Sequence, residues 1–189
     1  SWTWRKAPGF FDVVTYTGDG PPRRQISHDL GTTVGMTVVK CTSNSGYWHV
    51  LHRSNNAAKT LYLNRTDAEV NDTYAWNSTH ATSTHFTVGA GLNSSGRTYV
   101  AYLFAHNDGD GEFGPDGDAD IIKCGSYTGN GSSTGPEIDL GFEPQWLLVK
   151  DATSANNWLL FDNMRGLVTG GNDALLRPNL ADAELTSVD

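Results

Sequence analysis

The sequence contains an internal repeat of about 110 residues, and this repeat constrains the fold more than any other feature. Five anchors recur in the same order: 16–20 as 127–131, 29–31 as 139–141, 39–40 as 149–150, Trp48 as Trp158, and Asn64 with 67–69 as Asn179 with 182–184. A unit of this length is too large for one turn of a solenoid. It indicates a whole small module that has been duplicated.

The repeat divides the chain into three parts. Residues 1–8 are expected to be the closing strand of a preceding module or a linker, residues 9–114 the first module, and residues 115–189 a second, incomplete module. The second module lacks a counterpart of residues 71–106. We therefore expect the chain to be a window from a longer array. Alternatively, residues 1–8 or a neighbouring subunit supply the missing edge, since open strand edges invite pairing.

The local sequence pattern favours an all-β fold. Short alternating runs at 11–16, 36–40, 47–52 and 98–104 are separated by turns rich in Gly, Asn and Ser, which is typical of antiparallel strands. The chain has 21 Gly, 6 Trp, 7 Tyr and 7 Phe, a composition that suits a turn-rich sheet protein better than a helical bundle. We predict tandem antiparallel β-sandwiches. Helical turns are expected only near 65–70 and 180–185.

Charge and hydropathy exclude two classes of partner. The 13 Lys and Arg against 21 Asp and Glu give a net charge of −8, and no basic cluster is present, so nucleic-acid binding is not expected. No apolar run approaches the roughly 18 residues of a membrane helix, so membrane insertion is not expected either. The two cysteines, Cys41 and Cys124, are compatible with two free thiols or one disulfide.

The repeated segments carry a family resemblance. Residues 127–132, residues 139–150, Trp158 with 161–162, and Asn179 with 182–184 resemble repeat modules in tail and virion structural proteins of marine bacteriophages, as does the run 93–102. The resemblance implies a non-enzymatic virion protein in a tail fibre, tail-associated or capsid-decorating position. It implies other virion proteins as partners, homo-oligomerisation and attachment to host-surface glycans. It also implies that the sandwiches are of lectin-like or jelly-roll-like type, and it carries over no catalytic residues. A purely structural or adhesion module without a ligand is the alternative.

Aromatic residues that do not recur are the candidates for glycan binding. Trp76 and Tyr74 lie with Asn77 in a polar stretch, and exposed aromatic rings can stack on sugars. Trp48 and Trp158 recur within a strand pattern, which favours core packing. The alternative for Trp76 and Tyr74 is that they simply cover the sheet.

An acidic, Gly-rich loop before Ile121 is a candidate Ca²⁺ site. Carboxylate oxygens on a flexible loop suit Ca²⁺, although the EF-hand pattern is absent. The candidate ligands are Asp108, Asp110, Asp116 and Asp118. The alternative is a solvated linker between modules.

Glu137 and Asp139 suggest a third class, a sandwich-fold glycosidase. Alternate carboxylates on one strand can point into a single cleft. However, Gly141 and Pro144 should interrupt such a strand, and only Asp139 recurs in the repeat, as Asp29. A recurring Asp before Leu-Gly favours a turn-capping role, so no catalytic residue is expected.

Overall fold

The chain is all-β, with antiparallel sheets and almost no helix. The computed structural model describes residues 2–167 and 171–188. One short α-helix, α1 (Thr73–Trp76), and one 3-10 turn, η1 (Ala90–Leu92), interrupt the strands. The strands are β1 (Phe11–Thr17), β2 (Arg24–Ser27), β3 (Val34–Cys41), β4 (His49–His52), β5 (Lys59–Tyr62), β6 (Val70–Asn71), β7 (His85–Val88), β8 (Thr98–Ala105), β9 (Trp146–Val149), β10 (Leu159–Asp162), β11 (Asp173–Leu175) and β12 (Leu185–Val188).

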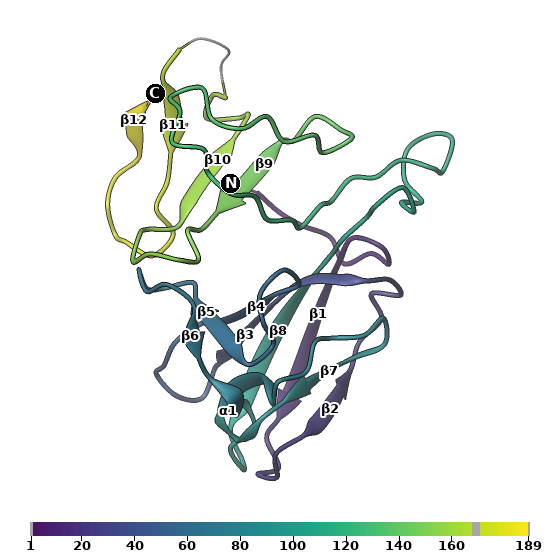
Figure 1. Ribbon diagram of the computed structural model, residues 1–189. Coiled ribbons are helices and arrows are strands. Elements are labelled where there is room, and N and C mark those ends of the chain that lie inside the picture. The colour runs from purple at the N-terminus through teal and green to yellow at the C-terminus, as the bar shows by residue number, and fades with distance from the viewer. Residues whose placement is uncertain (1, 168–170, 189) are drawn as a thin grey trace.

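A six-stranded antiparallel sheet forms the centre of the N-terminal half (Figure 1). Its strand order is β1-β8-β3-β4-β5-β6, so β8 lies between β1 and β3 although it is the last of these six strands in the sequence. Phe104 of β8 is opposite Phe11 of β1 on one side and Met36 of β3 on the other. The alternating runs predicted at 11–16, 36–40 and 98–104 are therefore confirmed as strands.

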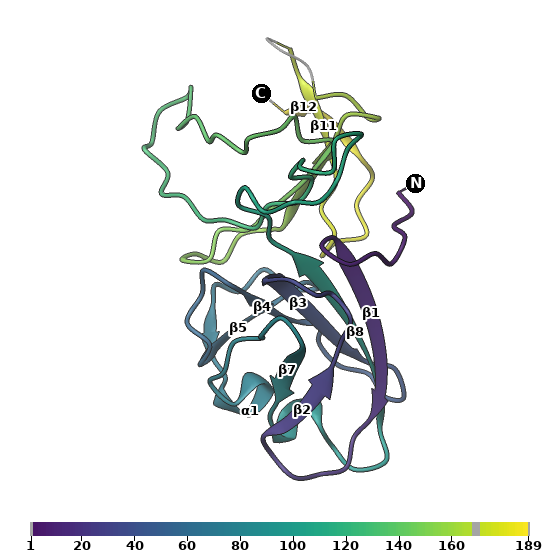
Figure 2. The ribbon, with the colours of Figure 1, turned by 90° about the vertical axis from the view of Figure 1, so that its right-hand side faces the viewer.

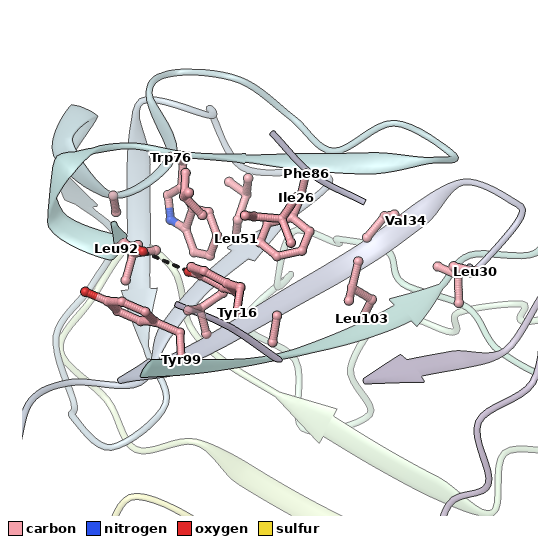
Figure 3. Packing of buried hydrophobic residues seen from close by; sticks show 14 of the residues in the cluster. Tyr16, Ile26, Leu30, Val34, Leu51, Trp76, Phe86, Leu92, Tyr99 and Leu103 are labelled. Carbon is pink, nitrogen blue, oxygen red and sulfur yellow. Dashed lines mark hydrogen bonds between the residues drawn. The ribbon is translucent and has the colours of Figure 1, made fainter. Parts of the chain in front are cut away.

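One face of this sheet is covered by the β2–β7 pair and α1. Ile26 of β2 and Phe86 of β7 pack with Trp76 of α1 against the buried residues Val39 and Leu103 of the sheet (Figure 3). The layer of two further strands over the sheet is consistent with a β-sandwich. We call this face of the sheet the inner face, and its apolar cluster, the larger of the two, the inner core.

The C-terminal half of the chain covers part of the other face of the sheet, at the end where the two halves meet (Figure 2). A second buried cluster, the outer-face cluster, joins Trp158 of the C-terminal half to Phe11, Met36, Val38 and Phe104 of the sheet. Figure 2 shows the C-terminal strands as a separate group beside the end of the large sheet. The sheet is thus buried on its inner face and, where it meets the C-terminal half, on the other face as well.

The C-terminal half contains two strand pairs, β9–β10 and β11–β12. An isolated bridge between Leu160 and Leu176 connects them. Residues 120–145 form no strand, although they include the sequence counterpart of β1. In the N-terminal half β1 pairs with β8, and none of the strands described in the C-terminal half corresponds to β8. Without that partner the extended segment has no ladder to join.

Two expectations from the sequence need comment. The helical turns expected near 65–70 and 180–185 are wrong, because neither segment contains helix and only their last residues, Val70 and Leu185, belong to strands, β6 and β12. The α-helix begins later, where Asp72 caps it by accepting from the N–H groups of Tyr74 and Ala75. Cys41 and Cys124 are both free thiols. Burial raises the pKa of Cys124 to about 12.

Candidate functional site

A shallow depression lies beside α1, between the turn that precedes β2 and the 3-10 turn η1. It brings together segments that are distant in the sequence. The lining residues are Pro22, Arg23, Thr73, Tyr74, Asn77, Ser78, Gly89 and Ala90.

The backbone around this depression is unusual. Arg23, Asn77 and Ser78 have φ values of 66°, 51° and 53°, in the left-handed region that non-glycine residues rarely adopt. All three line the depression. Asn77 is the C-cap of α1, a position where Asn tolerates this conformation, but Arg23 and Ser78 carry a cost of about 1–3 kcal/mol each. Uncommon backbone conformations of this kind often cluster at binding sites.

Gly89 fixes α1 against the rest of the domain. A Cβ atom at Gly89 would lie 2.1 Å from the carbonyl oxygen of Tyr74, so only glycine fits there. The Gly89 N–H donates to the carbonyl oxygen of Ala75 at 2.7 Å. This close approach of two backbones holds Tyr74 at the edge of the depression.

The structure separates the three residues predicted to bind glycans. Tyr74 is 72% exposed and lines the depression with Asn77. Trp76 is 0% exposed, and its indole Nε1 donates to Thr60 Oγ1 at 3.1 Å inside the inner core. The prediction that the Trp76 ring stacks on a sugar is therefore wrong, because no face of the ring reaches solvent. Trp76 instead packs in the inner core and anchors α1 there.

Arg23 belongs to the depression and was not predicted from the sequence. It follows two consecutive prolines, Pro21 and Pro22, which restrict the backbone at the turn. This proline pair is the signal that could have drawn attention to it.

The acidic loop does not form the predicted Ca²⁺ site. Asp108 pairs with Lys123 at 3.2 Å, and Asp110 accepts from the backbone N–H of Asp108 at 2.9 Å. Asp116 and Asp118 are exposed. Nowhere in residues 2–167 and 171–188 do three acidic, His or Cys side chains gather in a way that could hold a metal ion. The prediction of these four ligands is wrong because they do not form such a group, and Asp108 and Asp110 are directed at different partners.

Asp120, which was not among the predicted ligands, organises this loop instead. Its carboxylate accepts from the N–H groups of Gly109 at 2.7 Å and Gly111 at 2.8 Å. These two backbone hydrogen bonds, the Gly109 bond first, lower the pKa of Asp120. The carboxylate thus closes the loop between the two halves of the chain.

Glu137 and Asp139 lie in an exposed loop, not on a strand. The alternation argument for paired catalytic carboxylates therefore does not apply to them. Asp139 accepts from the N–H of Gly141 at 2.8 Å, and Gly141 has a φ of 78°. This is the turn-capping geometry expected for an Asp before Leu-Gly.

The β3–β4 and β9–β10 hairpins share one register. Met36 pairs with His52 and Val39 with His49, while Trp146 pairs with Asp162 and Val149 with Leu159. Each residue of the second hairpin lies 110 positions after its counterpart. The two hairpins are therefore equivalent in backbone pairing as well as in sequence position.

Side-chain hydrogen bonds around the two hairpins are also equivalent. Asn64 Oδ1 accepts from the backbone N–H of Trp48 at 2.9 Å, and Asn179 Oδ1 accepts from that of Trp158 at 2.9 Å. Lys40 Nζ donates to the carbonyl oxygens of residues 41 and 44, and Lys150 Nζ to those of residues 151 and 154. The recurring Asn, Lys and Trp thus hold the same hairpin loop in both halves.

The second hairpin contacts the first half through polar as well as apolar groups. Trp158 Nε1 donates to the carbonyl oxygen of Tyr62 at 2.9 Å. The backbone N–H of Glu69 donates to the carbonyl oxygen of Ala152 at 2.9 Å, and Lys150 Nζ donates to that of Thr66 at 3.3 Å. These contacts fix how the two halves sit against each other.

Comparison with known proteins gives one match. A family model described as a domain of unknown function, DUF7483, matches residues 5–189. No curated protein and no solved structure matches. None of the helices in the described part of the chain has the length and hydrophobicity needed to cross a membrane.

Proposed function

We propose a role for this chain, which belongs to the DUF7483 family of unknown function, from its sequence resemblance together with the contacts described above. The chain is a non-enzymatic structural protein of a bacteriophage virion, in a tail fibre, tail-associated or capsid-decorating position. It consists of tandem lectin-like β-sandwich modules, residues 9–114 and the incomplete 115–189. These modules stack on one another and contribute to attachment to host-surface glycans.

The tandem arrangement is supported by the two equivalent hairpins. Sequence repetition alone leaves open whether two segments fold alike. Here β9–β10 repeats the pairing of β3–β4 at a constant spacing of 110 residues. Asn179 and Lys150 repeat the hydrogen bonds of Asn64 and Lys40. Shared strand register and shared side-chain contacts favour a duplicated module.

The observation that carries the structural role is the burial of Trp158. This residue of the second module is 3% exposed and lies within the outer-face cluster of the first module. A recurring tryptophan that inserts into the neighbouring module is a stacking contact, which a binding pocket or a catalytic cleft does not need. Such contacts favour a rigid array of modules.

The depression beside α1 supports the attachment role. Tyr74 offers an exposed ring, and Arg23 and Asn77 offer polar groups that can hydrogen-bond to hydroxyl or carboxylate oxygens. A shallow site of this kind binds one sugar weakly. Repetition of modules in a homo-oligomer on the particle, assembled with other virion proteins, would raise the overall affinity through avidity.

Glycan-array binding of the protein displayed in multivalent form tests this proposal. We expect binding to bacterial surface glycans that falls on the Tyr74→Ala substitution. Tyr127→Ala is the matched control, because Tyr127 is also exposed, at 56%, but lies outside the depression. Equal loss in both variants, or no binding at all, would remove the attachment role and leave a structural module without a ligand.

Release of reducing sugar from the same glycans tests the enzymatic alternative. The proposal predicts no release. Release that is lost on Glu137→Gln would overturn the non-enzymatic role.

A further inference from the structure

Strand β9 has one edge that no strand covers in the part of the chain that the structure describes. Its sheet contains only β9 and β10. The equivalent strand β3 is paired on both sides, with β4 and with β8. The uncovered edge of β9 is therefore the edge that β8 occupies in the first module.

The hydrogen-bond direction along β3 identifies which groups of β9 face this edge. Directly after β3, the N–H of Thr42 donates to the carbonyl oxygen of Thr98 in β8. Within β3, the carbonyl oxygen of Gly35 accepts from the N–H of Arg53, which follows β4. Even-numbered residues of β3 thus face β8 and odd-numbered residues face β4, because the direction alternates along a strand. Each residue of β9 lies 110 positions after its counterpart in β3, an even number, so the even-numbered residues of β9 face the edge that corresponds to β8. The N–H groups of Trp146, Leu148 and Lys150 accordingly face the uncovered edge.

The adjoining face of the β9–β10 pair is also less covered than its counterpart. Leu147 is 37% exposed, while its counterpart Thr37 is 1% exposed. Val149 and Phe161 are half-buried and lie outside both apolar clusters, while their counterparts in the first module, Val39 and Leu51, belong to the inner core. An open edge beside an apolar face marks an incomplete sandwich.

We propose that this edge of β9 receives a strand of the β8 type, supplied by a module-closing run from outside these 189 residues. The occupant has the pattern of Thr98–Ala105, an apolar strand in which the alternate residues Tyr99, Ala101 and Leu103 are buried in the core. The first module supports this choice, since it shows the same edge filled by such a strand in a defined register, Val38 opposite Tyr102. Addition of a strand to an exposed sheet edge is a common mode of peptide recognition.

The N-terminal segment of the same chain is not the occupant. Trp4 lies in the outer-face cluster, with its ring 5.1 Å from that of Phe104 and 5.0 Å from that of Trp146. Residues 2–6 form no strand. This segment is committed to the contact between the two halves of the chain.

A synthetic peptide of residues 93–107 tests the proposal on the full chain. We expect the peptide to bind and to slow hydrogen exchange of the Trp146, Leu148 and Lys150 amides, as detected by NMR. A scrambled peptide of the same composition should leave these amides unchanged. If the peptide binds without protecting these amides, or does not bind, the proposal is wrong. Protection already present in the protein alone would mean that a second copy of this chain covers the edge, which would also overturn it.

Two N-methylated peptides give a matched control. The N–H of peptide residue Tyr102 would face β9, whereas that of Leu103 would point away from it, as the pairings of β8 with β3 and β1 indicate. N-methylation at Tyr102 should weaken binding on the order of tenfold or more, and N-methylation at Leu103 should have little effect. The reverse order would contradict the register.

Two protein variants test the β9 side of the contact. Leu148→Pro removes the N–H that faces the edge, and Leu148→Ala keeps this N–H while shortening the side chain. Peptide binding should be lost in the first variant and retained in the second. The inference rests on the same module equivalence as the proposed function, but glycan binding at Tyr74 and peptide binding at β9 are measured separately and can fail separately.

Discussion

Trp158 and Tyr62 join the two halves of the chain through a hydrogen bond of 2.9 Å from the indole Nε1 to the main-chain carbonyl oxygen. They lie 96 residues apart in the sequence. The indole is almost fully buried against the outer face of the large sheet. The contact therefore combines apolar burial with one specific polar bond.

Trp158→Ala should destabilise the attachment of the C-terminal half. Removal of a buried tryptophan costs about 3–5 kcal/mol, and here the carbonyl of Tyr62 also loses its donor. The inner core around Trp76 and Phe86 does not contain Trp158 and should remain folded. We expect urea unfolding, followed by tryptophan fluorescence, to separate into two transitions with the first at lower urea concentration.

Trp48→Ala is the control for this prediction. Trp48 occupies the equivalent position in the repeat but is only half-buried, with its ring 6.1 Å from that of Tyr102. It should lose less stability than the Trp158 variant. Equal losses in the two variants would show that Trp158 has no special role in joining the halves.

Gly89→Ala should displace α1. The new Cβ would lie 2.1 Å from the carbonyl oxygen of Tyr74, so one of the two backbones must move. We expect a loss of stability of about 1–3 kcal/mol and altered NMR shifts around Tyr74. Gly91→Ala is the matched change, because its Cβ would lie 3.2 Å from the same oxygen and requires only a small adjustment. A larger effect at Gly91 than at Gly89 would contradict this account.

Stability should fall as the pH falls from about 6.5 to about 4, because of His52. Burial, followed by the nearby charges of Arg53 and His106, lowers the pKa of His52 from 6.5 to about 4. In this range the unfolded chain binds a proton that the folded chain does not, so acid favours unfolding. Above pH 6.5 both forms are neutral and the contribution of His52 is fully present.

His52→Gln should reduce the pH dependence of the free energy of unfolding between pH 6.5 and 4. Urea titrations at several pH values measure this slope. His80→Gln is the control, because His80 is exposed, and it should leave most of the slope. His28, His49 and His106 also have lowered pKa values, with burial as the largest cause. Part of the slope should therefore persist in the His52 variant.

The loop at 108–120 should depend on Asp120 and not on Ca²⁺. Calorimetric titration with Ca²⁺ should give no binding heat, because the carboxylates of Asp108 and Asp110 are directed at different partners. Asp120→Ala should speed hydrogen exchange at Gly109 and Gly111, because the Asp120 carboxylate accepts hydrogen bonds from their N–H groups. A saturable Ca²⁺ signal that disappears in Asp108→Asn would contradict this prediction.

The strands that alternate were predictable, and those that depend on a distant partner were not. The sequence patterns at 11–16 and 98–104 predict β1 and β8 because one strand face is buried and side chains alternate. The same reasoning fails for residues 122–128, which align with β1 but form no strand. A strand needs a ladder partner, and a local pattern does not report whether that partner exists.

The candidate site was predictable in part, for a similar reason. The polar surroundings of Trp76 suggested exposure, but the cap at Asp72 starts a helical turn that directs the indole toward Thr60. Tyr74 and Asn77 do lie together at the surface, while Arg23 joins them only through folding. The acidic loop shows the same limit, because the sequence gives the number of carboxylates and not the direction of each.

The position of β8 also sets the order in which the chain can fold during synthesis. β1 and β3 emerge from the ribosome before β8, yet β8 must lie between them and is the last of the six strands to be made. Until residue 105 has emerged, β1 has no ladder partner and β3 exposes an edge. Such waiting edges slow folding and expose a nascent chain to pairing with its neighbours on the same polysome. The time needed to translate residues 41–97 therefore sets how long the edges of β1 and β3 remain unpaired and able to pair with another nascent chain.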